Sequence, residues 1–185
     1  MIELNVDQLS RVERTLGHIP DSIPKVVARA INRAADTAKT EAAKTVRRTY
    51  YISHKDVLST MRIYRATPND MQAAVVSKGQ VVPLAKFRMT PKKPDPRRKK
   101  PIVARVMRGS GGPIKHAFVA RMKSGHVGVF WRVGKKRLPL EQRFGPSVPE
   151  MLNSPSTIAW VERKANEKLD ERLDHEMKRV LEGNE

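Results

Sequence analysis

A long helical repeat between Ile23 and about Tyr50 constrains the fold of this chain more than any other feature. At about 1.5 Å per residue, such a helix is roughly 40 Å long. Its inward stripe is mostly alanine, so another element can approach its axis closely. Packing within the chain and packing between subunits of a ring both remain open for this helix. The repeat is defined by Val27, Ala30, Ile31, Ala34, Ala38, Ala42 and Val46.

A second long helix is predicted near the C-terminus. Ser154 and Ser156 are candidate N-caps on either side of Pro155, and the last turn ends at Gly183. A proline at this point suits the first turn of a helix, because its missing amide would have no partner there. The apolar stripe consists of Ile158, Val161, Ala165, Leu169, Leu173, Met177, Val180 and Leu181.

The segment before the first long helix predicts two smaller elements. Alternation from Met1 to Val6 indicates a short strand. Asp7 is then a candidate cap for a short helix that ends near Gly17. Ser22 is the candidate N-cap of the long helix, with Pro24 in its first turn.

Short alternating runs between the long helices predict antiparallel strands. Ser53 with Asp56 resembles a capping box for a short helix through Met61. Pro83 places its run at a sheet edge or a bulge, because proline cannot donate to a ladder. We therefore predict an α+β fold in one domain, 1–185, with long N-terminal and C-terminal helices packed on an antiparallel β-sheet. The runs are 62–67, 71–78, 81–87, 102–107, 117–122 and 127–133.

The charge of the chain restricts its partners. It has 37 Lys and Arg against 19 Asp and Glu, a net charge of +18. Such a balance favours polyanions, whether nucleic acid, acidic protein surfaces or anionic membrane. The absence of cysteine excludes disulfides, thiolate catalysis and thiolate metal sites. No signal peptide or bilayer-length apolar run is visible, so we expect a soluble protein made in the cytoplasm.

A proline-rich basic segment, 88–101, is predicted to be a flexible loop inserted between strands. It is a candidate contact for a phosphate backbone or for an acidic protein, and a merely solvated loop is the alternative. No aromatic residues interleave the charges, which favours the protein contact. No module that reads nucleic-acid sequence accompanies the loop. The candidate contact residues are Lys92, Lys93, Arg97, Arg98, Lys99 and Lys100.

A second candidate surface is the proline-containing turn at 137–151. A rigid, partly apolar turn costs little entropy to order when it docks, although it can also simply cover its own core. Phe144 and Val148 should be buried against a core or a neighbouring subunit, and Gly145 should need a backbone that a β-carbon disfavours. The candidate partner-binding residues are Leu140, Arg143, Phe144, Gly145, Pro146, Ser147, Val148 and Pro149.

Patterns typical of catalysis or metal binding are missing from the sequence. The five histidines stand at no metal-ligand spacing. The glycine run 109–112 lacks the ending of a phosphate-binding loop and fits a hinge or hairpin tip better. No nucleophile elbow or paired-carboxylate pattern is recognisable. We therefore expect no catalytic residues, metal, cofactor, small-molecule substrate or membrane partner.

An ordered set of short motifs resembles the minor tail protein Z family of long-tailed bacteriophages. Each motif is weak alone, but the set covers most of the chain in order. One departure is the stretch Ile114-Lys115-His116 before Ala117, which stands where a glycine is common in the family. The motifs are A-I-N-R-A-A at 30–35, Y-Y-I at 50–52, K-D-V at 55–57, V-P-L-A-K-F at 82–87, A-F-V-A at 117–120, G-H-V-G-V-F at 125–130 followed by Arg132, and G-P-S-V-P at 145–149.

The resemblance implies a structural virion protein rather than an enzyme. It implies a tail-completion component at the neck, between the tail terminator and the head–tail connector, near the end of the genomic DNA. A homo-oligomeric ring, six copies by analogy, is expected. The alternative is a basic nucleic-acid-binding protein of phage or bacterial origin without sequence specificity, which should display one contiguous basic face.

Overall fold

A computed structural model describes residues 5–183 of the chain, and these residues form two compact units. Unit 1 consists of 1–43, 61–77 and 154–185, and unit 2 consists of 44–60 and 78–153. The chain thus passes between the units four times. We keep a single domain as a prediction, because neither unit is built from one continuous segment.

Unit 1 begins with helix α1, Val6–Leu16, which is capped by Asn5. The Asn5 Oδ1 accepts from the Gln8 amide at 2.8 Å, and the Gln8 Oε1 accepts from the Asn5 amide at 3.0 Å. This reciprocal capping box displaces the predicted cap at Asp7 by two residues. The predicted strand at 1–6 falls mainly on residues outside the described range, and Val6 is already helical.

The two long helices are confirmed. Helix α2 spans Ile23–Thr49 and follows a 3-10 turn, η1, at Pro20–Ser22. Ser22 directly precedes α2 and donates its hydroxyl to the Ile19 carbonyl oxygen at 2.7 Å, and its role as N-cap stays a prediction. Helix α5 spans Pro155–Leu181, and the Ser154 side chain accepts from the Thr157 amide as predicted for an N-cap.

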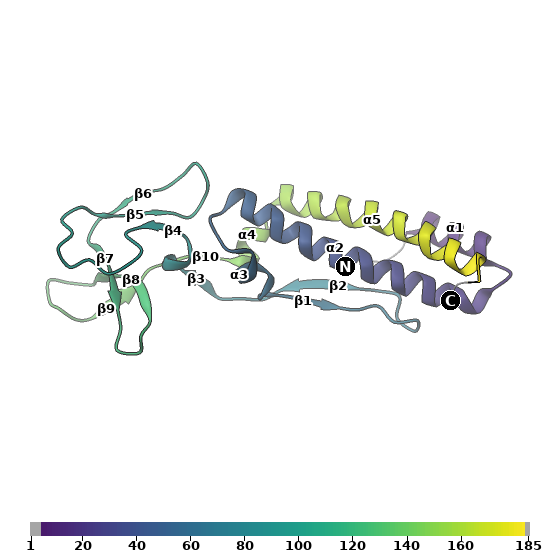
Figure 1. The fold of residues 1–185 in the computed structure, drawn as a ribbon, viewed down its shortest axis with the longest axis horizontal. Helices are drawn as coiled ribbons and strands as arrows, with labels where there is room; N and C mark the ends of the chain where they lie inside the picture. The colour runs from purple at the N-terminus through teal and green to yellow at the C-terminus, as the bar shows by residue number, and fades with distance from the viewer. Residues whose placement is uncertain (1–4, 184–185) are drawn as a thin grey trace. The chain divides into compact units, whose positions relative to one another are not determined.

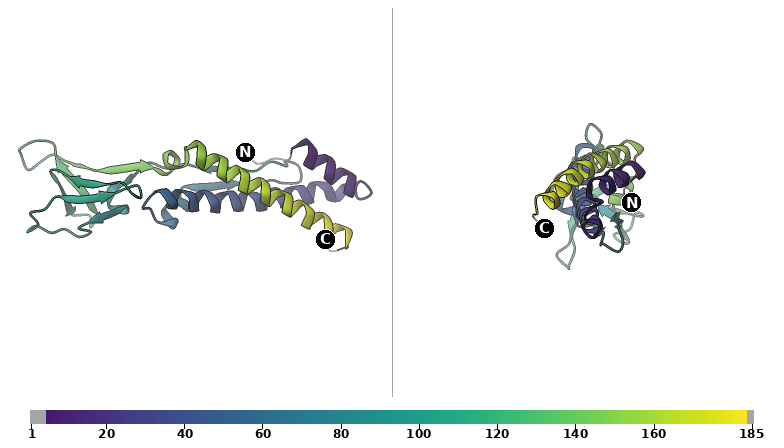
Figure 2. Two further views of the ribbon diagram at one scale, coloured as in Figure 1. Left: turned by 90° about the horizontal axis from the view of Figure 1, so that it is seen from above. Right: turned by 90° about the vertical axis from the view of Figure 1, so that its right-hand side faces the viewer.

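The core of unit 1 lies among α1, α2, α5 and a hairpin of two strands. Strand β1, Met61–Tyr64, pairs antiparallel with β2, Ala74–Ser77. Figures 1 and 2 show α2 and α5 running beside each other. The Asn32 side chain both donates to and accepts from the Ala66 backbone at 2.9 Å, which fastens the hairpin to α2. Fully buried side chains include Leu16, Ile31, Leu169 and Leu173.

Unit 2 contains eight strands in three small antiparallel sheets, with two short helices. The sheet orders are β10-β3, β4-β5-β6 and β7-β8-β9. Helix α3 ends at Leu58 rather than at the predicted Met61, because Met61 already pairs with Ser77. The elements are α3 His54–Leu58, β3 Val81–Pro83, η2 Leu84–Lys86, β4 Arg88–Thr90, β5 Ile102–Arg105, β6 Gly112–Ile114, β7 Ala117–Arg121, β8 Val127–Arg132, β9 Leu140–Gln142, β10 Phe144–Ser147 and α4 Val148–Leu152.

The predicted α+β class and antiparallel pairing are confirmed, and the hairpin of β7 and β8 forms where the sequence placed it. Pro83 lies in a strand of a two-stranded sheet, and the partner strand β10 carries a register shift between Gly145 and Ser147. The sequence did not indicate that the strands divide among four separate sheets, one in unit 1 and three in unit 2.

Candidate partner-binding surfaces

The predicted partner-binding turn folds as the end of β9, all of β10 and the start of α4. Gly145 pairs with Val82, and a β-carbon on it would lie 2.6 Å from the Phe87 Cε2. Its φ is not in the left-handed region, so the expectation of a special backbone is wrong there. Glycine is needed at this position because a β-carbon would clash with the Phe87 ring, not because of its φ.

The C-terminal half of this turn is anchored. Val148 and Met151 are buried, and the Ser147 and Glu150 side chains cap α4 reciprocally. Pro149 stands in the first turn of α4, where a missing amide costs nothing. The burial predicted for Val148 is therefore met by the core of unit 2. The turn is a rigid support rather than a mobile loop.

The other half of the turn presents side chains to solvent. Phe144 is 46% exposed and pairs with Pro83, while Val81, which pairs with Ser147 on the same two strands, is 52% exposed. Arg143 donates its amide to the Val129 carbonyl oxygen at 2.8 Å and places its guanidinium 4.0 Å from the Trp131 ring centre. Leu140 and Pro146 are half-buried. The predicted residues thus lie together, with Phe144 as the outward apolar side chain.

The basic loop has local order that its composition did not indicate. The Asp95 Oδ1 accepts from the Arg97 amide at 3.1 Å, and the Asp95 carbonyl oxygen accepts from the Arg98 amide at 3.2 Å. The Arg98 guanidinium donates to the carbonyl oxygens of Lys100 and Pro101. Arg98 is half-buried, and the other candidate cations of the loop, Lys92, Lys93, Arg97, Lys99 and Lys100, are exposed.

Two concave surfaces in unit 2 carry cations. One, of about 400 Å³, lies between the basic loop and β7, with Phe118 and Arg132 in its wall. The other, of about 470 Å³, is lined by Lys44, Arg47, Arg48 and Arg108. Sequence reasoning missed both, because their residues are far apart along the chain and only the fold brings them together.

Arg108 is held firmly at the second surface. Its Nε donates to the Arg47 carbonyl oxygen at 2.9 Å, and its guanidinium carbon lies 4.7 Å from the centre of the Tyr51 ring. The Arg108 amide donates to the Thr49 carbonyl oxygen at 2.7 Å. A cation at this position satisfies carbonyl groups at the C-terminal end of α2, where the helix dipole favours positive charge.

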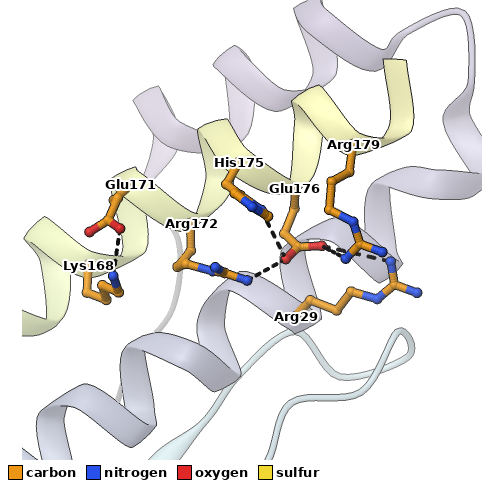
Figure 3. A network of polar contacts seen from close by, with 7 residues as sticks. All are labelled: Arg29, Lys168, Glu171, Arg172, His175, Glu176 and Arg179. Carbon is orange, nitrogen blue, oxygen red and sulfur yellow. Dashed lines mark hydrogen bonds and ion pairs between the residues drawn. The ribbon is translucent and has the colours of Figure 1, made fainter. Parts of the chain in front are cut away.

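A buried carboxylate organises charge in unit 1. The Glu176 side chain is 3% exposed, and Figure 3 shows four nitrogen-bearing side chains directed at it. Arg172 and Arg179 donate to it at 2.8 and 3.1 Å, and a nitrogen of Arg29 on α2 lies 3.9 Å away. Because Arg29 and Glu176 belong to different helices, the cluster ties α2 to α5. A carboxylate this fully paired suits a structural role better than proton transfer.

Comparison with known proteins shows the family of the chain. Residues 2–183 match the family described as prophage minor tail protein Z (GPZ). The chain belongs to this family. The tail completion protein of Escherichia phage N15 is 26% identical over 168 residues, which cover 87% of this chain and 82% of that relative. No solved structure matches at a significant level.

The turn before β7 has an unusual backbone at His116. His116 has a φ of 60°, in the left-handed region that favours glycine. Histidine is among the residues that enter this region more readily than most side chains. The turn between β6 and β7 therefore has a backbone conformation that favours glycine, although a histidine occupies it.

The charge of this minor tail protein Z is divided unequally between its units. Unit 2 carries 23 Lys and Arg against 4 Asp and Glu, whereas unit 1 carries 14 against 15. The basic loop is thus one part of a unit in which basic residues strongly outnumber acidic ones. Across residues 5–183, no three His, Asp or Glu side chains gather as a metal site requires. No helix in that same range is long and apolar enough to cross a membrane.

Proposed function

We propose that this minor tail protein is a non-enzymatic structural component that completes the head-proximal end of a long non-contractile phage tail. It is made in the host cytoplasm and resides at the tail neck of the virion, where it joins the tail terminator to the head–tail connector. It acts as a homo-oligomeric ring, with six copies expected by analogy. Its work is to bury surface between subunits.

The observation that carries this proposal is the exposed Phe144 on an anchored turn. Its ring is nearly half exposed, while Val148 and Met151 hold the following helix in the core. Full burial of such a side chain contributes about 1.5–3 kcal/mol, so covering its exposed half at an interface contributes about 1 kcal/mol. A rigid support adds to this gain because little entropy is lost on docking. Phe144, with the exposed Val81 on the partner strand, supports an interface with a neighbouring subunit or tail protein.

Phe144→Ala tests the interface. We expect an unchanged melting temperature for the isolated protein and loss of the protein from particles, measured by immunoblotting of purified virions. Leu138→Ala is the matched control, because Leu138 is 66% exposed in the same segment and lies outside the candidate set. Gly145→Val combined with Phe144→Ala should abolish incorporation too. Normal infectious phage from Phe144→Ala would reduce the turn to a passive surface.

The position in the virion is tested by imaging. Gold-labelled antibody against this protein should decorate the head-proximal end of the tail, and a ring should appear there in averaged images of the neck. Label found only at the distal tip, or on no particle at all, would refute the proposed location.

The basic loop is proposed to contact an acidic surface of another tail protein rather than the DNA end. Replacing Arg97, Arg98, Lys99 and Lys100 by serine should give tails that lack this protein. Tails that join heads normally but hold the DNA end in the wrong place would favour the DNA contact. Unchanged particles with full infectivity would make the loop merely a solvated segment.

The strong charge of unit 2 favours one alternative function, non-specific binding of nucleic acid. A contiguous basic surface binds phosphate backbones with an affinity that falls steeply with salt. The two functions differ in where the protein is found: a nucleic-acid binder is recovered with DNA from infected cells, and a tail component with purified tails. Fractionation of a lysate, followed by immunoblotting, distinguishes them.

A further inference from the structure

The concavity between the basic loop and β7 combines an apolar wall with a cationic rim. Ile102, Phe118 and Val119 supply apolar surface, and Arg98, Lys100 and Arg132 supply positive charge, around a volume of about 400 Å³. All of these residues belong to unit 2. A concavity of this size, with apolar and polar surface in similar shares, can hold one side chain of a partner and fix it with charged groups.

The pocket lies along β7, an outer strand of its sheet that also approaches β5. Three consecutive residues of β7, Ala117, Phe118 and Val119, contribute to its wall. Successive side chains of a strand point to opposite faces, so a wall that includes all three runs along the edge of the strand. β7 is the outer strand in the order β7-β8-β9, and its other edge pairs with β8. An exposed strand edge is a template for an added extended segment.

The cations at the rim are held in place. The Arg98 Nε donates to the Lys100 carbonyl oxygen at 3.1 Å, and its Nη2 donates to the Pro101 carbonyl oxygen. The guanidinium carbon of Arg132 lies 5.3 Å from the centre of the Phe118 ring. Asp95, the carboxylate in this wall, has one oxygen engaged with the Arg97 amide. The pocket therefore keeps a net positive rim that is arranged before any partner binds.

We infer that this pocket binds an extended acidic segment of a neighbouring protein, with one apolar side chain of that segment in the cavity. The inference rests on the proposed structural role and gives the basic loop a defined contact. A phosphate backbone would leave the surface of Phe118 and Val119 unused. It would suit the purely cationic surface at Arg47 and Arg108 better.

The alternation of residues in the loop provides a matched test. Arg98 and Lys100 line the pocket, whereas Arg97 and Lys99 do not. Two double variants, Arg98→Ser with Lys100→Ser and Arg97→Ser with Lys99→Ser, remove the same charge from the same loop. The probe is a short fluorescein-labelled peptide of alternating glutamate and leucine, titrated with the full chain and followed by fluorescence anisotropy.

We expect the first double variant to weaken peptide binding by about tenfold or more and the second by less than about threefold. Arg132→Gln and Phe118→Ala should weaken it as well, while Arg121→Gln on the same hairpin should not. These variants lie outside the loop, so they test the pocket even if serine substitutions disorder the loop. Peptides with lysine for glutamate, or serine for leucine, should bind at least about tenfold more weakly.

Equal weakening by the two double variants would overturn the inference, since it would indicate diffuse attraction to the whole loop. Tighter binding of a single-stranded oligonucleotide, lost in the Arg98 and Lys100 variant, would overturn it in favour of nucleic acid. A negative result for peptide binding can be distinguished from failure of the proposed function. If the peptide does not bind but Phe144→Ala still removes the protein from particles, only the pocket assignment falls.

Discussion

The two units of this protein use charge in opposite ways. Unit 1 is close to neutral, with 14 basic and 15 acidic residues, and unit 2 has 23 basic residues against 4 acidic ones. In unit 1, Glu176 draws together Arg29, Arg172 and Arg179. In unit 2, Lys86 and Asp56 form an ion pair, but most cations have no carboxylate available.

We attribute this difference to two uses of charge: ion pairs that stabilise a fold, and an excess of cations that attracts a partner. An ion pair inside a unit offsets the loss of hydration and fixes how helices meet. An excess of one sign instead opposes compaction through self-repulsion and attracts a partner of the other sign. The fold of unit 2 therefore bears an electrostatic cost that the proposed acidic partner would relieve. The predictions below test this division.

Glu176→Gln should have the largest effect. It leaves Arg29, Arg172 and Arg179 together without a counter-charge at a buried position. Removing one partner of a buried pair costs about 3–5 kcal/mol, but these arginines are partly exposed, so we expect about 2 kcal/mol. Urea unfolding measures the loss of stability.

Glu171→Gln is the matched control on the same helix (Figure 3). A hydrogen bond from Lys168 holds the pKa of the Glu171 carboxyl below its ordinary value, although partial desolvation opposes this. The side chain is exposed, and its removal should leave the melting temperature unchanged. Equal losses for both variants would mean that burial of the charge in unit 1 is not what matters.

Salt should stabilise the protein by a smaller amount. Raising sodium chloride screens the mutual repulsion of cations in unit 2, and the screening length is about 10 Å at 0.1 M. We expect a gain of about 1 kcal/mol, seen as an upward shift of about 2–4 °C in the melting temperature. Lys135→Gln with Lys136→Gln should reduce the shift. A melting temperature that falls with salt would show that ion pairs dominate after all.

The pair of Asp56 and Lys86 should give the smallest effect. The hydrogen bond from Lys86, with a second from Ser53, lowers the pKa of Asp56, and burial opposes this. A lowered pKa adds stability above the ordinary value of about 3.9, and this stability is lost as pH falls through the lower folded value. Asp56→Asn should therefore cost less than about 1 kcal/mol at pH 6, and the difference should shrink as the pH falls below the ordinary pKa and vanish once Asp56 is protonated in the folded state. A difference that is constant with pH would exclude this linkage.

Much of the fold followed from periodicity in the sequence. The stripes from Val27 to Val46 and from Ala165 to Val180 predicted α2 and α5, because helices of this length depend on one buried face. Short elements were less well placed. Asn5 rather than Asp7 caps α1, since both residues are equally good caps and only the reciprocal bond with Gln8 decides. Sheet membership depends on long-range pairing that a local pattern does not contain.

The candidate sites were predicted as segments, not as surfaces. The turn around Phe144 was located, but its division into buried Val148 and exposed Phe144 required the core of unit 2. Gly145 was expected to need a special backbone, whereas the constraint comes from Phe87, far away in sequence. The pocket at Phe118 and Arg132 had no signal in the sequence, because its wall joins the basic loop to a strand that follows it.

Because the chain crosses between its units four times, the two units are completed at different stages of synthesis. All segments of unit 2 have been synthesised once residue 153 is made, whereas unit 1 still lacks α5. Until α5 is made, the apolar stripe of α2 lacks the cover that Leu169 and Leu173 supply, although α1 and the β1–β2 hairpin already belong to the same core. A chain truncated before α5 would leave part of this alanine-rich stripe exposed. The core of unit 1 therefore closes only after α5 has been synthesised.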